Sequence, residues 1–319
     1  MSERFQVFLI KYGTKMKLFF SFISLFFVLT SYGQEFSNSW KDVNYAGDTN
    51  TYHNLDIYLP KTQKKSYPVI ISIYGSAWMA NNMKGSDLKV LGKPLLDAGF
   101  AVVTPNHRSS KDALFPAQIH DIKAVIRYLR ANAAKYQIDT SFIGITGSSS
   151  GGNMAAMAGT TRFVKEQTLE EVTVDIEGSL GNFTNYSSSV DAVVDWFGPT
   201  NMLVMDSCGG TVFTHNAADS PASLYIGGPI QEHKAKCLLA SPTTYIDKND
   251  PPFLIFHGDK DNVVPFCQSE LLYKELKENG VQCEFHLVPE GQHGPVVQTE
   301  KYLNMMVDFF NKELQKKKE

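Results

Sequence analysis

The chain has 319 residues, of which 43% are hydrophobic and 20% are charged. This composition supplies enough apolar material for one large folded domain and is not that of a disordered chain. Its 30 basic and 33 acidic residues give a net charge of −3, which argues against nucleic acid or an anionic membrane surface as a partner.

The N-terminus has the pattern of a secretory signal peptide. Basic residues between positions 4 and 17 precede an uncharged run over residues 18–29, and small residues near position 33 offer a cleavage site. The run is shorter than the roughly 20 apolar residues that a membrane-spanning helix needs. We therefore predict a signal peptide over residues 1–33 and a secreted or periplasmic domain over residues 34–319, with no membrane insertion after cleavage. Met16 is an alternative start.

The first part of this domain alternates between strand and helix patterns. An extended region over residues 45–60 is followed by compact apolar strands at 68–74 and 100–104. Apolar residues then recur at helical spacing over residues 117–134, which predicts an amphipathic helix. Such alternation is typical of an α/β fold, in which a mainly parallel central sheet is covered by helices on both faces. Functional residues then gather at one edge of the sheet.

The run over residues 147–152 reads Gly-Ser-Ser-Ser-Gly-Gly and lies between the apolar strand 142–146 and a helix of small residues. Glycine two positions before and after Ser149 is the signature of a nucleophile elbow. The turn is too sharp for side chains at both flanks, and it holds the serine hydroxyl out at the sheet edge. This spacing selects Ser149 over Ser148 and Ser150. A Gly/Ser cluster can also be an ordinary turn or linker.

The second half of the chain continues the alternation after one long interruption. A strand is predicted over residues 190–197, helices near 268–279 and 303–310, and an insertion over about 201–247 that is rich in Ser, Thr, Gly and Pro. The insertion has room for short helices of its own and is a candidate lid over the site. A surface loop without a function fits the same pattern.

Two polar turns in this half supply partners for Ser149. A buried strand runs into a turn that bears Asp259 and Asp261, and the strand 283–288 leads into a glycine-flanked loop that bears His293. The order serine, aspartate, histidine is that of an α/β-hydrolase. We predict that His293 takes the Ser149 proton during attack on an acyl carbon and that Asp261 orients the ring. Asp259 is the alternative acid.

Acyl transfer also needs backbone N–H groups that face the negative oxygen of the tetrahedral intermediate. One candidate is the amide of Ser150, directly after the nucleophile. The other is the amide of Ser76 or of Ala77, where Tyr-Gly-Ser-Ala stands in place of the usual His-Gly-Gly-Gly, and the pattern does not decide between them. Trp78 and Phe115 are predicted to line an aromatic cleft for substrate, with core packing as the alternative.

The cysteines and the remaining histidines indicate neither a metal nor a cofactor. Cys208 and Cys237 flank one irregular stretch and could form a disulfide after export, whereas a bond between Cys267 and Cys283 would have to span a helix. None of the four has zinc-ligand spacing. His257 is interpreted as a structural residue of the acid turn. The other histidines form no constellation: His53, His107, His120, His215, His233 and His286.

Six stretches carry a resemblance to a known family: residues 115–118, 124–139, 147–152, 197–200, 240–242 and 257–265. Through them the chain resembles the α/β-hydrolase esterases, and among these the bacterial feruloyl esterase and acetylxylan esterase-like group. The resemblance implies a serine esterase with the triad Ser149, Asp261 and His293. It also implies removal of acetyl or feruloyl groups from plant polysaccharides or oligosaccharides through an acyl-enzyme.

Two other functions stay open on the sequence alone. An exopeptidase of the prolyl oligopeptidase type shares the elbow and the His-Gly-Asp turn, although this chain has no room for the propeller domain of those enzymes. A binding protein with a hydrolase fold is the non-enzymatic alternative. Such proteins usually lack one member of the triad, and here all three residues are present.

Overall fold

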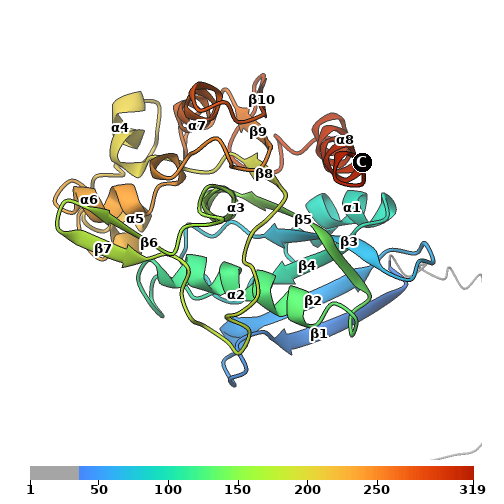
Figure 1. Cartoon of the computed structure of the whole chain (residues 1–319). Coiled ribbons are helices and arrows are strands. Elements are labelled where there is room, and N and C mark those ends of the chain that lie inside the picture. Colours follow the sequence, from blue (N-terminus) through green and yellow to red (C-terminus); the bar gives the residue numbers. More distant parts are fainter. Residues whose placement is uncertain (1–35) are drawn as a thin grey trace, which may run out of the picture. The chain divides into compact units, whose positions relative to one another are not determined.

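The computed structural model describes residues 36–319 (Figure 1). The predicted signal peptide and its cleavage site therefore lie outside the described residues. Within residues 36–319, no helix is both long enough and apolar enough to cross a membrane.

An eight-stranded sheet forms the centre of the described chain, with the strand order β1-β2-β4-β3-β5-β8-β9-β10. The pairs β1–β2 and β2–β4 are antiparallel, and every other neighbouring pair in the sheet is parallel. This arrangement confirms the predicted α/β-hydrolase class. The strands are β1 (Asn38–Asn44), β2 (Asn54–Leu59), β3 (Tyr67–Ile73), β4 (Ala101–Pro105), β5 (Ile138–Ser148), β8 (Ala192–Trp196), β9 (Phe253–Gly258) and β10 (Cys283–Val288).

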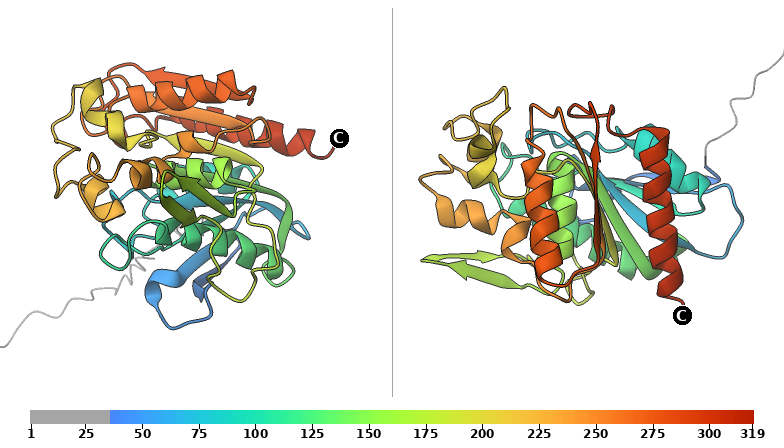
Figure 2. Two further views of the ribbon diagram at one scale, coloured as in Figure 1. Left: turned by 60° about the vertical axis from the view of Figure 1, so that its left-hand side comes forward. Right: turned by 90° about the horizontal axis from the view of Figure 1, so that it is seen from above.

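Helices cover both faces of this sheet, and Figure 2 (right) shows α1 and α8 on one side and α3 and α7 on the other. The central strands are buried on both faces because successive side chains point in opposite directions. In β3, for example, Val69 and Ile71 join one hydrophobic core and Ile70 joins the other. The helices are α1 (Lys93–Asp97), α2 (Ala117–Ala131), α3 (Ser150–Thr160), α7 (Cys267–Glu278) and α8 (Glu300–Lys316).

Most of the predicted elements are confirmed, and the differences are one edge strand and several short elements outside the central sheet. Strand β1 precedes the extended region that was predicted over residues 45–60. The sequence pattern also missed the π-helical turn Leu88–Gly92 before α1 and the small hairpin of β6 (Glu166–Leu169) and β7 (Val172–Asp175). These short elements carry too few residues to show a period of their own.

The insertion over residues 201–247 contains short helices, as predicted. They are η3 (Met202–Val204), α4 (Met205–Cys208), α5 (Pro221–Ile226), α6 (Lys234–Leu239) and η4 (Pro242–Thr244). Figure 1 shows α4, α5 and α6 grouped beside the sheet, next to the β6–β7 hairpin. The insertion is therefore a folded part of the molecule and contributes to its core through residues such as Met202, Met205 and Tyr225.

The disulfide joins Cys208 to Cys267, with their Cα atoms 6.2 Å apart, so the expected bond between Cys208 and Cys237 is wrong. Cys237 is buried and unpaired, and so is Cys283. The reason is tertiary: the end of α4 packs against the start of α7, while Cys237 points into the hydrophobic core. The bond thereby fastens the insertion to the chain just after the turn that bears Asp261.

This connectivity predicts a stability that depends on redox conditions. The bonded residues are separated by 59 positions, which corresponds to a chain-entropy stabilisation of about 4 kcal/mol. We expect a reductant to lower the free energy of unfolding of the wild-type chain by up to this amount and to leave the Cys208→Ser/Cys267→Ser variant unaffected. Denaturant unfolding with and without reductant measures the difference. Equal sensitivity of both proteins to the reductant would contradict the bond.

Candidate active site

Ser149 sits between β5 and α3 in a backbone conformation that is strained for any residue with a side chain, with φ 56° and ψ −122°. Its N–H donates to the Trp196 carbonyl at 2.9 Å. Glycine is required at both flanks, because a Cβ on Gly147 would lie 2.3 Å from the Gly151 carbonyl oxygen. A Cβ on Gly151 would lie 2.2 Å from the Ile73 oxygen. The tight turn thus presents the Ser149 hydroxyl at the carboxyl end of β5.

The structure brings Ser149, His293 and Asp261 together at the carboxyl ends of β5, β10 and β9. His293 Nε2 is 3.0 Å from Ser149 Oγ, and His293 Nδ1 is 2.7 Å from Asp261 Oδ2. The other carboxylate oxygen of Asp261 accepts the N–H groups of Val263 and Val264, each at 2.9 Å. The Asp261 side chain is fully buried, while that of His293 is 19% exposed. These distances allow a serine hydroxyl to pass its proton to a ring that a carboxylate orients.

A second buried imidazole, His257, lies against the same carboxylate. Its Nε2 is 2.9 Å from the Val264 carbonyl and 3.3 Å from Asp261 Oδ2, and its Nδ1 is 2.7 Å from Ser269 Oγ. Since Nε2 faces two acceptors, it carries the hydrogen. Burial alone would raise the pKa of Asp261, but the hydrogen bonds from His257 and His293 outweigh burial and hold this pKa well below its ordinary value. Asp261 therefore stays ionised between two rings.

The alternative acid, Asp259, lies earlier in the turn and makes no contact of this kind. Its N–H donates to the Val288 carbonyl at 3.1 Å, at the point where β9 and β10 end. The ring of His293 instead meets Asp261. Among the described residues, no group of three or more His, Cys, Asp or Glu side chains is arranged to hold a metal ion.

The turn after β3 lies directly against the elbow. The Ser76 N–H donates to Ser150 Oγ at 2.9 Å, so this amide is already engaged. The next residue, Ala77, has φ 51° and lines the cavity beside Ser149. Ser150 is the first residue of α3, where a backbone N–H has no partner inside the helix. Of the three amides that the sequence singled out, those of Ala77 and Ser150 are left for a ligand oxygen.

Two cavities meet at Ser149. The first has a volume of about 220 Å³ and is almost entirely apolar. The second, about 330 Å³, is more open and lies on the side of His293. The first is lined by Ala77, Trp78, Ser149, Ser150, Pro199, Met205, Phe213, His215, Pro221, Ala222, Val263 and Val264. The second includes Gly75, Ser76, Asp87, Ser148, Phe197, Gly294, Pro295 and Gln298.

The two aromatic residues predicted to line a cleft have different positions. Trp78 lines the apolar cavity and stacks on Tyr225, with ring centroids 4.4 Å apart and planes 7° apart. Phe115 is only 2% exposed and lines neither of these two cavities, so its predicted contact with substrate is wrong. It packs edge-on against Tyr225 at 5.6 Å and therefore supports Trp78 from behind.

The insertion, which the sequence pattern placed over the site as a candidate lid, supplies a wall of the apolar cavity, but the pattern did not identify the residues involved. Met205, Phe213 and His215 come from this segment, together with Pro221 and Ala222 at the start of α5. The only signal in the sequence is an apolar pair, Val212 and Phe213, inside a polar stretch. These side chains become neighbours of Ser149 only through the tertiary fold.

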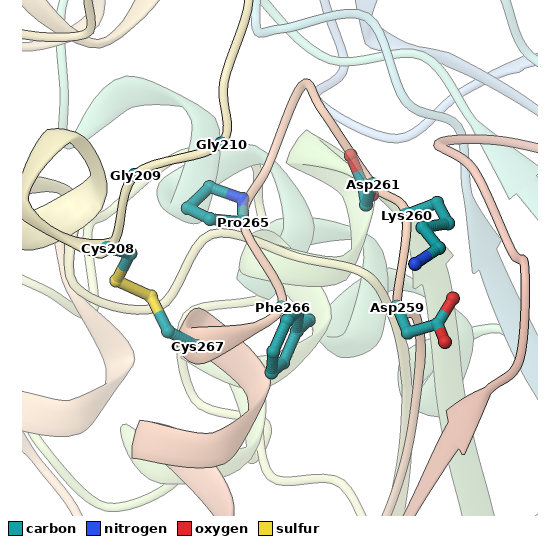
Figure 3. A pocket seen from close by; sticks show the side chains of 9 residues that line it. All are labelled: Cys208, Gly209, Gly210, Asp259, Lys260, Asp261, Pro265, Phe266 and Cys267. Atoms are coloured by element: carbon teal, nitrogen blue, oxygen red, sulfur yellow. A yellow bond between two sulfur atoms is a disulfide. The ribbon is translucent and has the colours of Figure 1, made fainter.

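A third hollow, of about 370 Å³, separates the disulfide from the acid turn. Figure 3 shows Cys208 and Cys267 on one side of it, with Pro265 close by, and Asp259 and Lys260 on the other. Neither Ser149 nor His293 lines it. The insertion is thus anchored near the acid turn twice, by the disulfide and by the Val212 N–H, which donates to the Asn262 carbonyl at 2.8 Å.

The model of the BD-FAE family matches residues 55–276, which is more than half of the chain. The chain belongs to the BD-FAE family. A solved truncated form of a carbohydrate esterase from gut microbiota is 53% identical, with a TM-score of 0.84 over 88% of this chain and 97% of that one. A bifunctional GH43-CE protein of Bacteroides eggerthii is also 53% identical, with a TM-score of 0.83 over 86% of this chain and 35% of that protein.

Among curated proteins, Esterase LipQ of Mycobacterium tuberculosis is 27% identical over 213 residues, which cover 67% of this chain and 46% of LipQ. The chain spans about half the length of the curated relatives it matches. The alignments therefore establish the family and the α/β-hydrolase fold of this BD-FAE chain.

Asp195, at the end of β8, is buried directly beneath the elbow. Its Oδ1 accepts the Gly198 N–H at 2.9 Å, its Oδ2 has no hydrogen-bond partner within residues 36–319, and a Cβ on Gly152 would lie 2.2 Å from Oδ1. Burial raises the pKa of Asp195 to about 7, against the single lowering effect of the Gly198 hydrogen bond. The folded chain thus holds a proton on Asp195 more tightly than the unfolded chain does.

This raised pKa predicts a pH dependence of stability. A carboxyl group whose pKa is raised in the folded state stabilises the fold at low pH. This contribution is lost as the pH rises from about 4 to 7, which here lowers the free energy of unfolding by about 4 kcal/mol. We expect Asp195→Asn, which stays neutral, to gain stability relative to the wild type across that range. Denaturant unfolding at pH 5 and pH 8 tests this. The same difference between the two proteins at both pH values would contradict it.

The contact between His257 and Asp261 predicts that His257 holds the Asp261 carboxylate in position for catalysis. Replacing His257 by Phe removes a hydrogen bond to a buried carboxylate, worth about 1.5–3 kcal/mol. We expect kcat for an ester substrate to fall about 10- to 100-fold with little change in KM. His257→Gln keeps an N–H donor and should recover part of the loss. Equal kcat values for the wild type and the Phe variant, with both folded by circular dichroism, would rule the effect out.

Proposed function

We propose that this chain is a secreted serine carboxylic-ester hydrolase that removes acyl groups from plant polysaccharides or oligosaccharides. The observation that carries the proposal is the hydrogen-bonded series Ser149, His293 and Asp261, which opens onto two cavities. Membership of the BD-FAE family and the 53% identity to a carbohydrate esterase support the same reaction class.

In this proposal the Ser149 oxygen attacks the ester carbonyl carbon while its proton passes to His293 Nε2. Asp261 stabilises the ring as it becomes charged. The carbon–oxygen bond to the alcohol then breaks, and His293 returns the proton to the departing sugar hydroxyl, leaving an acyl group on Ser149. A water molecule attacks this acyl group with His293 as the base again, which releases the acid and restores the serine.

The negative oxygen of each tetrahedral intermediate is assigned to the amides of Ala77 and Ser150. The engagement of the Ser76 amide by Ser150 Oγ supports this choice. The Ser150 side chain thereby holds the β3 turn against the elbow, so both donors are fixed before the substrate arrives. Such preorganised donors are worth about 3–4 kcal/mol each in acyl transfer.

The cavity volumes favour an aromatic acyl group over acetyl. An apolar cavity of about 150 Å³ holds benzene, and the cavity beside Ser149 is about 220 Å³. A feruloyl ring therefore fits the apolar cavity, whereas acetyl would leave most of it empty. The more open cavity beside His293 is the candidate site for the sugar.

Export is part of this proposal. The N-terminal pattern has the features of a signal peptide. The disulfide between Cys208 and Cys267 also suits an oxidising compartment outside the cytoplasm.

Exchange of Ser149 tests the proposed reaction. We expect Ser149→Ala to lower kcat/KM for methyl ferulate by about 10³-fold or more, because no other group replaces the nucleophile. The matched control is Ser141→Ala, an exposed serine at the far end of the same strand, which should retain wild-type turnover. Full activity of the Ser149 variant would refute the assignment. Cleavage of a dipeptide anilide without any ester turnover would favour an exopeptidase instead.

A further inference from the structure

Gln298 lies in the loop between β10 and α8, the loop that also carries His293. It lines the open cavity together with Ser149 and His293. In the proposed mechanism His293 returns a proton to the departing alcohol, so the side chains on its side of the site face the alcohol part of the ester. That mechanism gives Gln298 no role. Its surroundings therefore bear on which alcohols the site accepts.

Both the backbone and the side chain of Gln298 are fixed. Its N–H donates to the Pro295 carbonyl at 2.9 Å, and the preceding residue, Val297, is fully buried in the core. Its side-chain Nε2 donates to Ser148 Oγ at 2.8 Å. Ser148 directly precedes the proposed nucleophile and is only 8% exposed. The amide group of Gln298 is thus held beside the elbow before any alcohol enters.

The other end of this amide, Oε1, is free. Within residues 36–319 it accepts no hydrogen bond, yet it is not one of the buried polar atoms that lack a partner. It therefore keeps surface that is open to the cavity which Gln298 lines. An amide oxygen is a hydrogen-bond acceptor and not a donor. Gln298 thus offers one accessible acceptor at a defined place on the alcohol side of Ser149.

The other polar side chains of this wall are less well placed to meet an alcohol. Ser148 Oγ is already engaged by Gln298. Ser76 Oγ and Asp87 Oδ2 are buried atoms without a hydrogen-bond partner among the described residues, so they have no surface toward the cavity. Burial also raises the pKa of Asp87, which disfavours its charged form. Asp87 is nevertheless the rival acceptor that an experiment has to separate from Gln298.

We propose that Gln298 determines specificity for the alcohol by accepting a hydrogen bond from a hydroxyl group on the carbon next to the ester oxygen. A sugar ring carries such a neighbouring hydroxyl, whereas a simple alcohol does not. The proposal rests on the esterase function proposed above and names the feature by which the site distinguishes sugar esters. Because Oε1 is accessible to water when no alcohol is bound, the preference is a matter of several-fold rather than of many orders of magnitude.

The test compares the ferulate ester of trans-1,2-cyclohexanediol with cyclohexyl ferulate, which differ only in the neighbouring hydroxyl. The ratio of their kcat/KM values is divided by the ratio of their alkaline hydrolysis rates, which removes the intrinsic difference in reactivity. We expect this corrected ratio to be about 3- to 10-fold in favour of the hydroxylated ester for the wild type. Gln298→Leu should bring it close to 1. Gln298→Glu, which keeps an acceptor oxygen, should retain part of the preference.

Gln292→Leu is the matched control, because it makes the same chemical change at an exposed position of the same loop and should keep the wild-type ratio. If Gln298→Leu slows both esters equally, Gln298 merely fastens the loop to the elbow and the proposal is overturned. A wild-type ratio near 1, or a ratio that falls in Asp87→Asn and not in Gln298→Leu, would overturn it as well.

Each of these outcomes leaves the esterase function standing. Turnover of neither ferulate ester nor 4-nitrophenyl acetate by the wild type would overturn the esterase function together with the role of Gln298. Circular dichroism of each variant separates a loss of fold from a loss of preference.

Discussion

The close contact between the elbow and the turn after β3 is the constraint on which the site depends. A Cβ on Gly75 would lie 2.6 Å from the Ser148 carbonyl oxygen, and a Cβ on Gly151 would lie 2.2 Å from the Ile73 oxygen. Backbone therefore meets backbone on both sides of Ser149, with no space for side chains. The same contact fixes Ser149, the start of α3 and the turn that carries the amides of Ala77 and Ser76. Its consequence is that the proposed nucleophile and the proposed oxyanion donors share one rigid support.

The acid turn is a second rigid unit, built around one carboxylate. Asp261 accepts two backbone N–H groups on one oxygen and faces His257 and His293 on the other. The ring of His293 is thereby held between this carboxylate and the elbow, where Phe197 also packs against it with ring centroids 4.8 Å apart. The disulfide and the Val212 hydrogen bond attach the insertion to the same turn. A displacement of the insertion would therefore reach the acid as well as the cavity wall.

The sequence predicts the elements whose cause is local, and it fails where the cause is tertiary. The strands and the elbow at Ser149 follow from apolar runs and from glycines that a tight turn requires. The partner of Cys208 could not be predicted, because the packing of α4 on α7 decides it. Phe115 was predicted to line a cleft, yet it lies just before α2 and packs against Tyr225 in the core. His215 formed no recognisable pattern, since Asp206 and Ser220, which hydrogen-bond its backbone, meet it only in the fold.

The chemistry and the acyl specificity of this chain therefore have separate structural origins. The residues assigned to bond breaking lie at the ends of sheet strands, and short sequence motifs identify them. Five of the twelve residues that line the apolar cavity come from residues 201–247, where no periodic pattern constrains the sequence. Chains that share the elbow and the acid turn can accordingly differ in the acyl group they accept. The residues that line this cavity are then more informative about the substrate than the triad, because the triad chemistry is the same for every carboxylic ester.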